Sequence, residues 1–196
     1  MKSDLITYVM IVFVIIMVFK IYRESDVFQL KCIISNVDGK SYCVRETAKL
    51  QLVADLLAET TQNMTKLVKY LGEKYPTREN VKRLVKNYNP RKISETLPTS
   101  KYTAYSENKG EKLAFCTTTT KKGDKLIDRN TLMFVALHEL SHIATKSIGH
   151  TTEFWENFKY LIENAKRINI YQPVDYKKKP TKYCGMTISD SPYFDL

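Results

Sequence analysis

The sequence of 196 residues predicts an α+β domain preceded by one N-terminal transmembrane helix. An uncharged apolar run stands near the N-terminus, two pairs of strand-like segments each contain a turn signal, and the segments between and after them show helical periodicity. Because strands and helices do not alternate regularly, the pattern indicates an α+β arrangement with small antiparallel hairpins. We expect an anchor over residues 1–23, one domain over 24–170 and an irregular C-terminal extension over 171–196.

The apolar run extends from Leu5 to Phe19 without a charge. Counted as far as Tyr22 it reaches about 18 residues, near the lower limit for a helix that crosses a bilayer. Lys20 can extend its ammonium group to the lipid headgroups. A cleaved signal peptide is the alternative, but residues 19–24 lack the small side chains of a cleavage site. We therefore expect a retained single-pass anchor, whose orientation the nearly equal numbers of Lys and Arg on its two sides do not fix.

The next segments predict a hairpin followed by two helices. Strand-like residues 27–35 and 40–44 flank Asp38-Gly39, a strong signal for a two-residue turn. Apolar residues then recur at helical spacing from Glu46 to about Lys74, and Pro76 follows. Thr77 can cap a second helix over residues 78–88, with three side chains facing inward. These are Val81, Leu84 and Val85.

A second hairpin and two further helices are expected in the C-terminal half. Residues 101–106 and 112–117 have strand patterns and are joined through a loop that contains Gly110. Thr151 or Thr152 can cap a late helix with an apolar stripe, which we expect to pack behind the third histidine of the chain. The stripe comprises Phe154, Trp155, Phe158, Leu161 and Ile162.

The four cysteines, Cys32, Cys43, Cys116 and Cys184, show no zinc-knuckle spacing. A two-residue turn would set Cys32 and Cys43 diagonally across the first hairpin. A disulfide between them is therefore possible but not indicated, and isolated thiols are compatible with a reducing compartment. Cys184 near a metal site is an alternative extra ligand, although free cysteines are mostly buried packing residues.

All three histidines lie within thirteen residues, and two of them frame a glutamate in His138-Glu-Leu-Ser-His142. The preceding residues 131–137 are apolar on all sides, as in a buried helix, and Asp128 or Asn130 can cap it. Residues four apart on a helix leave the same face one turn apart. Both imidazoles can therefore bind one Zn²⁺, with Glu139 placed to act on a water at the metal.

His150 is the expected third metal ligand because Gly149 can end the helix and turn the chain back. The later acidic residues Glu153, Glu156 and Glu163 could serve instead, but His150 has the better context. Three histidines leave the fourth position open, as in catalytic rather than structural zinc sites. We therefore expect His138, His142 and His150 to bind zinc, and Glu139 to act as general base.

These residues, together with the run Gly149 to Trp155, resemble the zincin metallopeptidases and within them the WLM and SprT-like group. The longer metzincin pattern does not fit, because its third histidine follows the second by six residues rather than eight. The wider chain, including Tyr183-Cys-Gly-Met-Thr187, is similar to WLM-like proteins of large DNA viruses. The resemblance implies a zincin-like fold, hydrolysis of a protein or peptide substrate and, for a viral protein, a host or virion membrane. The expected membrane anchor distinguishes this chain from the cellular members of the group, which cleave proteins bound or crosslinked to DNA.

Two features of the expected mechanism and partners stay open in the sequence. The donor that stabilises the oxyanion is unassigned, and Tyr171, Tyr176 and Tyr183 are candidates. The formal charge of +10 suits acidic partners such as nucleic acid or anionic lipid, or is an ordinary solvated lysine-rich surface. The alternatives to a peptidase are a membrane-tethered zinc-binding scaffold and a basic nucleic-acid-binding module.

Overall fold

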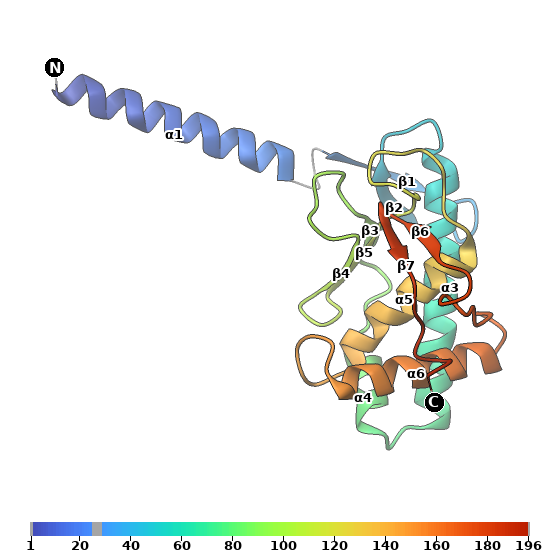
Figure 1. Cartoon of the computed structure of the whole chain (residues 1–196). Coiled ribbons are helices and arrows are strands. Elements are labelled where there is room, and N and C mark those ends of the chain that lie inside the picture. The colour runs from blue at the N-terminus through green and yellow to red at the C-terminus, as the bar shows by residue number, and fades with distance from the viewer. Residues whose placement is uncertain (1, 25–28, 196) are drawn as a thin grey trace.

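The computed structural model describes residues 2–24 and 29–195, in which helix α1 (Lys2–Glu24) projects from the rest of the chain (Figure 1). Its segment Leu5–Tyr22 is long and apolar enough to cross a membrane, and none of it is buried. Length and composition permit a signal sequence as well as an anchor. Residues 27 and 28, which the sequence assigns to the first strand, lie outside the described residues.

A five-stranded mixed sheet forms one part of the domain, in the order β1-β2-β3-β5-β4. The two predicted hairpins are present, and a strand that the sequence did not predict lies between them, parallel to both neighbours. Both hairpins are antiparallel as expected, but the sheet that contains them is mixed, which corrects the expectation of an antiparallel sheet. The missed strand has three residues, of which Ser94 and Glu95 are polar, so it carries no strand signal. The strands are β1 (Leu30–Ile34), β2 (Ser41–Arg45), β3 (Ile93–Glu95), β4 (Ala104–Glu107) and β5 (Lys112–Phe115).

The first hairpin has a longer loop than the sequence predicts. The amide of Ser35 donates to the carbonyl of Lys40 at 2.9 Å, so four residues rather than two make the turn. This change shifts the register by two residues and places Cys32 directly opposite Cys43. The two cysteines form a disulfide, which corrects the expected diagonal placement.

A second disulfide joins Cys116, directly after β5, to Cys184 near the C-terminus. All four cysteines are thus paired, and the expectation of free thiols was wrong. Cys184 is therefore not a metal ligand. The sequence could not reveal this pair because its members stand 68 residues apart.

Removing the second disulfide should destabilise the domain more than removing the first. The Cys116–Cys184 disulfide joins residues 68 positions apart, whereas Cys32 and Cys43 are 11 positions apart. A crosslink that closes a longer loop restricts the unfolded chain more. We expect Cys116→Ser with Cys184→Ser to lower the free energy of unfolding by about 2–4 kcal/mol. Chemical denaturation of the full chain, beside the Cys32→Ser/Cys43→Ser pair as control, measures this. An unchanged denaturation midpoint in the Cys116→Ser/Cys184→Ser protein would contradict this prediction.

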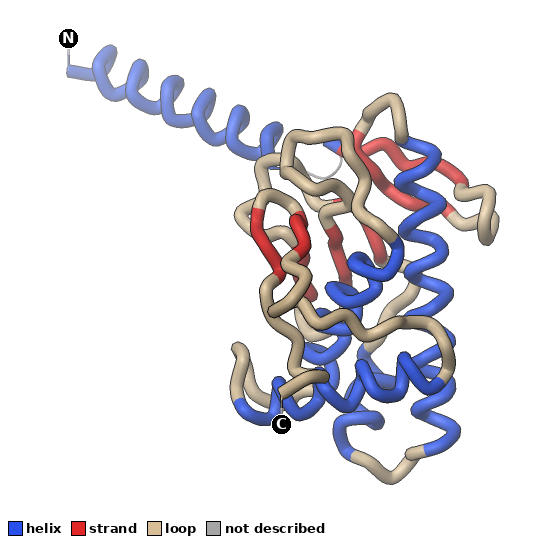
Figure 2. Tube along the Cα trace, turned by 45° about the vertical axis from the view of Figure 1, so that its right-hand side comes forward, coloured by secondary structure: helices blue, strands red, loops and turns tan. Residues whose placement is uncertain are grey.

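Helix α5 lies at the centre of the domain and contacts α3, α4, α6, β4 and β5. Figures 1 and 2 show α4 and α6 gathered at the end of the domain away from α1. The α5 helix is buried on nearly all sides, as its apolar run predicts. The four helices of the domain are α3 (Leu50–Lys74), α4 (Glu79–Asn87), α5 (Arg129–Ala144) and α6 (Thr152–Arg167).

The predicted helices are all present, but three details of them differ. Arg78, not Thr77, occupies the N-cap of α4, and no side chain caps that end. Val85 is 47 % exposed rather than inward, because the short helix buries only one narrow face. Trp155 is likewise 45 % exposed, whereas the rest of the predicted α6 stripe is buried against the core.

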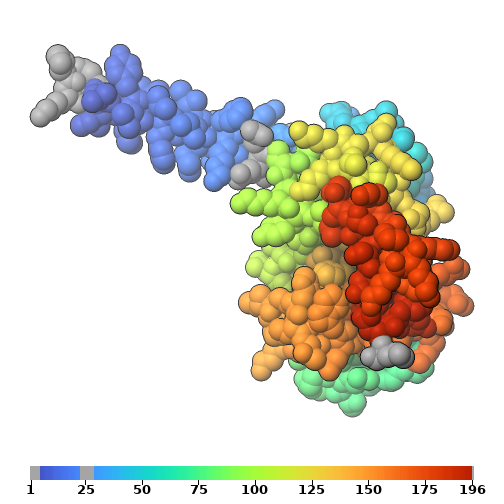
Figure 3. Space-filling model, viewed as in Figure 1, coloured from blue at the N-terminus to red at the C-terminus, as the bar shows by residue number. Residues whose placement is uncertain are grey.

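The C-terminal segment is more ordered than its composition suggests. It contains a hairpin of β6 (Thr181–Tyr183) and β7 (Met186–Ile188). Tyr171 and Tyr176 are buried and pack on Phe134 of α5, with ring centroids 6.1 and 4.8 Å away. Figure 3 shows the segment lying against the face of the domain rather than extending from it. The expectation of an irregular surface extension is corrected to this extent.

Candidate metal centre

Helix α5 places two of the three histidines. Asp128 caps the helix by accepting a hydrogen bond from the Thr131 amide at 2.9 Å. This confirms one of the two N-cap residues proposed from the sequence. The helix runs without interruption to Ala144, so His138 and His142 leave the same face one turn apart. The spacing of the motif and the observed geometry therefore agree.

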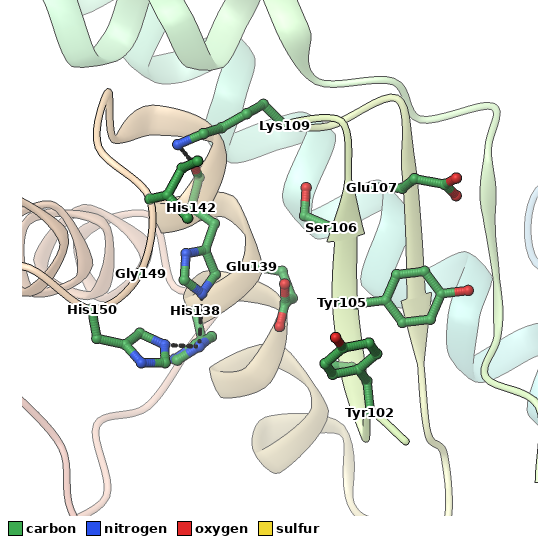
Figure 4. A pocket seen from close by; sticks show the side chains of 12 residues that line it. Tyr102, Tyr105, Ser106, Glu107, Lys109, His138, Glu139, His142, Gly149 and His150 are labelled. Atoms are coloured by element: carbon green, nitrogen blue, oxygen red, sulfur yellow. Dashed lines mark hydrogen bonds between the residues drawn. The ribbon is translucent and has the colours of Figure 1, made fainter. Parts of the chain in front are cut away.

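The nitrogens of the three histidines converge on one point (Figure 4). The Nε2 atom of His138 lies 3.2 Å from that of His142 and 3.1 Å from that of His150. All three ligand atoms lie within 4.8 Å of one another. Two nitrogens at roughly 2.0–2.1 Å from a tetrahedral zinc ion are about 3.3–3.4 Å apart. The side chains thus fit one zinc ion with three protein ligands.

The environment of the rings keeps them in the form that binds metal. Burial first, and the neighbouring imidazoles second, lower the pKa of His138 to about 3 and that of His142 to about 4. Both rings are therefore neutral near pH 7, and neutral imidazole is the ligand form. Phe154 of α6 packs against all three, with its centroid 4.9, 4.4 and 4.6 Å from His138, His142 and His150. This contact confirms that α6 lies behind the histidines.

The loop that carries His150 is fixed by two charged side chains that the sequence did not single out. The ammonium of Lys109, in the β4–β5 turn, donates to the carbonyls of Thr145 at 2.8 Å and Ser147 at 2.6 Å. Figure 4 shows a further, longer hydrogen bond from the same ammonium to the carbonyl of His142. The carboxylate of Glu153 accepts from the Lys146 amide at 3.1 Å. Gly149 adopts a φ of +84°, which glycine reaches without strain. The first part of the loop, residues 145–147, is therefore fixed by a cation from the sheet and a carboxylate from α6.

Replacing Lys109 by methionine should weaken metal binding by about 10–100-fold, the usual effect of losing a partner that orients a metal ligand. Methionine keeps the length of the side chain and removes the donor to the carbonyls of the loop. Zinc affinity measured by competition with a chelating dye checks this. Lys49→Met is the matched control, because Lys49 also donates to a backbone carbonyl, that of Asp124, away from the histidines. Equal affinities of the two variants would contradict a positioning role for Lys109.

Glu139 lies beside the histidines with 5 % of its surface exposed. Burial raises the pKa of its carboxyl group to about 8, and the backbone N–H of Ser106 on β4 opposes this by donating to the carboxylate. A cation at the three histidines would favour the ionised form further. The side chain is thus placed to accept a proton from a group bound next to the histidines (Figure 4).

Two adjoining cavities open at this point. The metal cleft, of about 610 Å³, lies between the histidines and β4 and is also lined by Tyr102, Tyr105 and Ile148. The apolar pocket, of about 320 Å³, lies between α5, α6 and the C-terminal hairpin. Ala104, His138 and Glu139 line both.

The three tyrosines considered as oxyanion donors do not line the metal cleft. The hydroxyl of Tyr183 donates to the carbonyl of Thr103 at 3.0 Å, and Tyr183 lines the apolar pocket instead. Tyr171 and Tyr176 are packing residues under α5. The structure therefore gives these three a role in packing, which their position late in the sequence could not reveal.

Comparisons with known proteins find viral relatives. The chain is 32 % identical over 160 residues to an uncharacterized protein of Acanthamoeba polyphaga mimivirus, covering 80 % of this chain and 81 % of that protein. It is 33 % identical over 75 residues to an uncharacterized protein of Invertebrate iridescent virus 6, covering 38 % of this chain and 41 % of that protein. A protein of Invertebrate iridescent virus 3 is 35 % identical over 85 residues, with coverage of 42 % and 50 %.

Among solved structures, the chain is similar to the crystal structure of Wss1 from Saccharomyces cerevisiae. The TM-score is 0.47 and the sequence identity 16 %, over 64 % of this chain and 87 % of that one. No protein-family model matches the sequence. On the identity and coverage of the mimivirus relative, the chain belongs to the same family as that viral protein.

Proposed function

We propose that the chain is a zinc-dependent metallopeptidase of the zincin type, which hydrolyses peptide bonds. The observation that carries the proposal is the convergence of three histidine nitrogens beside a buried glutamate, in a cleft whose other side is lined by the edge strand β4. A structural zinc site usually has four protein ligands, whereas this cluster offers three. The donor set therefore favours catalysis over a purely structural role.

The residues of the chain divide the work of hydrolysis between them. His138, His142 and His150 hold the metal, and the chemistry that zinc supplies when bound is a water with a pKa of about 7 and polarisation of the carbonyl oxygen. Glu139 takes one proton from the attacking water and returns it to the leaving amine. Its carboxylate is oriented for this by the Ser106 amide.

Strand β4 offers a binding edge for an extended peptide. It is the last strand of the sheet and pairs only with β5 in the described part of the chain. The backbone N–H of Ser106 donates to Glu139, and the carbonyl of Thr103 accepts from the amide of Cys116, directly after β5. Because the backbone N–H and C=O groups of successive residues in a strand point to opposite sides, those of Ala104 point away from β5 and toward the cleft. A peptide that adds to this edge would pass directly in front of the histidines.

We propose that α1 is a retained anchor that tethers the peptidase domain to a host or virion membrane. The absence of small residues near its end argues against cleavage. Both cysteine pairs form disulfides, which persist in oxidising surroundings. The domain should therefore face an oxidising compartment or the outside of the particle. Membrane-impermeant thiol labelling, before and after reduction of intact membranes, tests this topology.

Unfolded casein is the substrate that tests the activity, because an edge strand pairs with extended rather than folded chains. The full chain is incubated with zinc and casein in water enriched in oxygen-18, and the fragments are analysed by mass spectrometry. Hydrolysis predicts new C-termini that carry one heavy oxygen and disappear when a chelator is added. Intact casein under all conditions would contradict the peptidase and favour a zinc-binding scaffold.

A further inference from the structure

We propose that a basic groove on the outer face of the sheet binds the phosphate group of an anionic lipid, in the membrane that α1 enters. The groove has a volume of about 420 Å³, extends across β1, β2, β3 and the start of β5, and shares no lining residue with the metal cleft. The inference rests on the proposed anchor and not on the peptidase activity. It adds a second binding site and a fixed position of the domain on the bilayer.

The outer face of the sheet is the one that points away from α3. Tyr42 and Val44 of β2 are buried in the core on the side of α3, so Cys43 between them points to the opposite side. Cys43 lies directly opposite Cys32 on β1 and Ser94 on β3, and directly opposite residues share a face of the sheet. The Cys32–Cys43 disulfide and the Ser94 side chain therefore form the floor of the groove.

Ser94 contributes a hydroxyl group without a partner. The residue is 7 % exposed, and its Oγ atom makes no hydrogen bond in the described part of the chain. A buried hydroxyl without a hydrogen bond is costly, and folded proteins contain few of them. An oxygen of a phosphate group in the groove would accept a hydrogen bond from this hydroxyl, whereas an apolar ligand would not.

Three cationic side chains line the groove, those of Arg91, Lys92 and Lys112. Lys92 forms an ion pair with Glu111 at 3.3 Å, but both side chains are more than half exposed. Such an exposed pair contributes little stability, so Lys92 can exchange this carboxylate for a phosphate. No acidic residue lines the groove in the described part of the chain. The charge is therefore complementary to a phosphate, with which lysine and arginine form charge-assisted hydrogen bonds.

The short connection to α1 favours a lipid as the source of the phosphate. Leu30 of β1 lines the groove and follows Tyr22, the end of the candidate membrane span, by eight positions. A fully extended chain of this length reaches roughly 26–29 Å. Figure 1 shows α1 joining the domain at the end that carries β1 and β2. The groove is thus held close to the headgroups, where the surface potential of anionic lipids attracts basic side chains.

Lysine footprinting can detect occupation of the groove at single residues. The full chain is placed in nanodiscs of neutral phosphatidylcholine with an increasing fraction of phosphatidylserine, and brief acetylation of each lysine is measured by mass spectrometry. We expect saturable protection of Lys92 and Lys112 as the anionic fraction rises. Acetylation of Lys86 on α4, at the end of the domain away from α1, should stay unchanged. Absence of protection at Lys92 and Lys112 in every lipid mixture would overturn the proposal.

A pair of substitutions tests the role of the cations. Arg91→Gln with Lys112→Gln should raise the phosphatidylserine fraction needed for half protection of Lys92 at least tenfold, because each cation near an anionic surface contributes roughly fivefold in affinity. Lys82→Gln with Lys86→Gln is the matched control, since it changes the net charge equally on α4. An equal effect of the two pairs would indicate a diffuse attraction by the total charge and would overturn a site at the groove.

Ser94→Ala tests the buried part of the site without a change in charge. The variant lacks a hydroxyl that the described residues leave unpaired, so the melting temperature should stay equal or rise. We expect the phosphatidylserine fraction for half protection to rise about 2–10-fold, the usual contribution of one hydrogen bond. A folded Ser94→Ala protein with the lipid dependence of the parent would leave only exposed cations and would overturn the proposed phosphate site.

Two further measurements separate the lipid from other phosphates and the groove from the anchor. In neutral nanodiscs, inorganic phosphate or duplex DNA replaces phosphatidylserine, and protection of Lys92 and Lys112 by either one but not by the lipid would overturn the proposal. Neutral vesicles that carry the full chain are also washed with alkaline carbonate. A chain that is washed off has no anchor, which contradicts both proposals. A chain that stays, but shows no protection with phosphatidylserine, keeps the anchor and contradicts the groove alone.

Discussion

Replacing Glu139 by glutamine should lower the rate of peptide hydrolysis by about 10²–10⁴-fold, the usual contribution of a general acid-base group. Glutamine keeps the shape of the buried side chain, but its amide does not accept the proton of the attacking water. The three histidines are unchanged, so zinc should remain bound. Initial rates on casein and native mass spectrometry of the same sample measure the two properties separately.

Glu156→Gln provides the control for this substitution. Glu156 lies exposed on α6 and lines neither cavity at the site, so the variant should retain the rate of the parent. Full activity in the Glu139→Gln protein would remove Glu139 from the mechanism. Loss of both activity and zinc would instead assign it a role in holding the metal.

Replacing His150 by alanine should reduce zinc affinity by about a hundredfold. Structural sites with four ligands bind zinc with an apparent free energy of about 10–16 kcal/mol, so one ligand contributes on the order of 3 kcal/mol. A difference of 1.36 kcal/mol is tenfold in an equilibrium constant, which gives the hundredfold. His150 is exposed, so its removal should change the stability of the metal-free fold little. Competition with a chelating dye measures the affinity.

Two further variants decide whether the imidazole itself matters. His150→Cys should recover part of the affinity, because a thiolate is also a good zinc ligand. Ile148→Ala, two residues earlier on the same loop and 90 % exposed, should bind zinc as the parent does. If His150→Ala bound zinc as tightly as the parent, the site would have a different third ligand, and the assignment from the sequence would be wrong.

The parts of the fold that depend on local signals could be predicted from the sequence. Helical periodicity indicated α3 and α6, the apolar run with its cap and the histidine spacing indicated α5, and turn residues indicated both hairpins. The parts that depend on distant contacts could not. Strand β3 is stabilised by the strands on both sides and by burial of Glu95 against Arg45, and nothing in its own three residues indicates a strand.

The same distinction applies to the candidate site. The spacing of His138 and His142 is sufficient to place them on one face, and Gly149 indicated a turn toward His150. The residues that complete the site come from other segments: Lys109 from a turn of the sheet, and Ser106 from strand β4. Neither carries a local pattern, and their positions depend on the packing of β4 against α5.

Restoring zinc to the metal-free protein tests the central claim most directly. The full chain is treated with a chelator, dialysed, and assayed for casein hydrolysis as zinc is added in known amounts. We expect no cleavage without metal and a linear rise that ends at one zinc per chain. Cleavage that is unaffected by the chelator, or no cleavage at any zinc concentration, would contradict a zinc peptidase built on His138, His142 and His150.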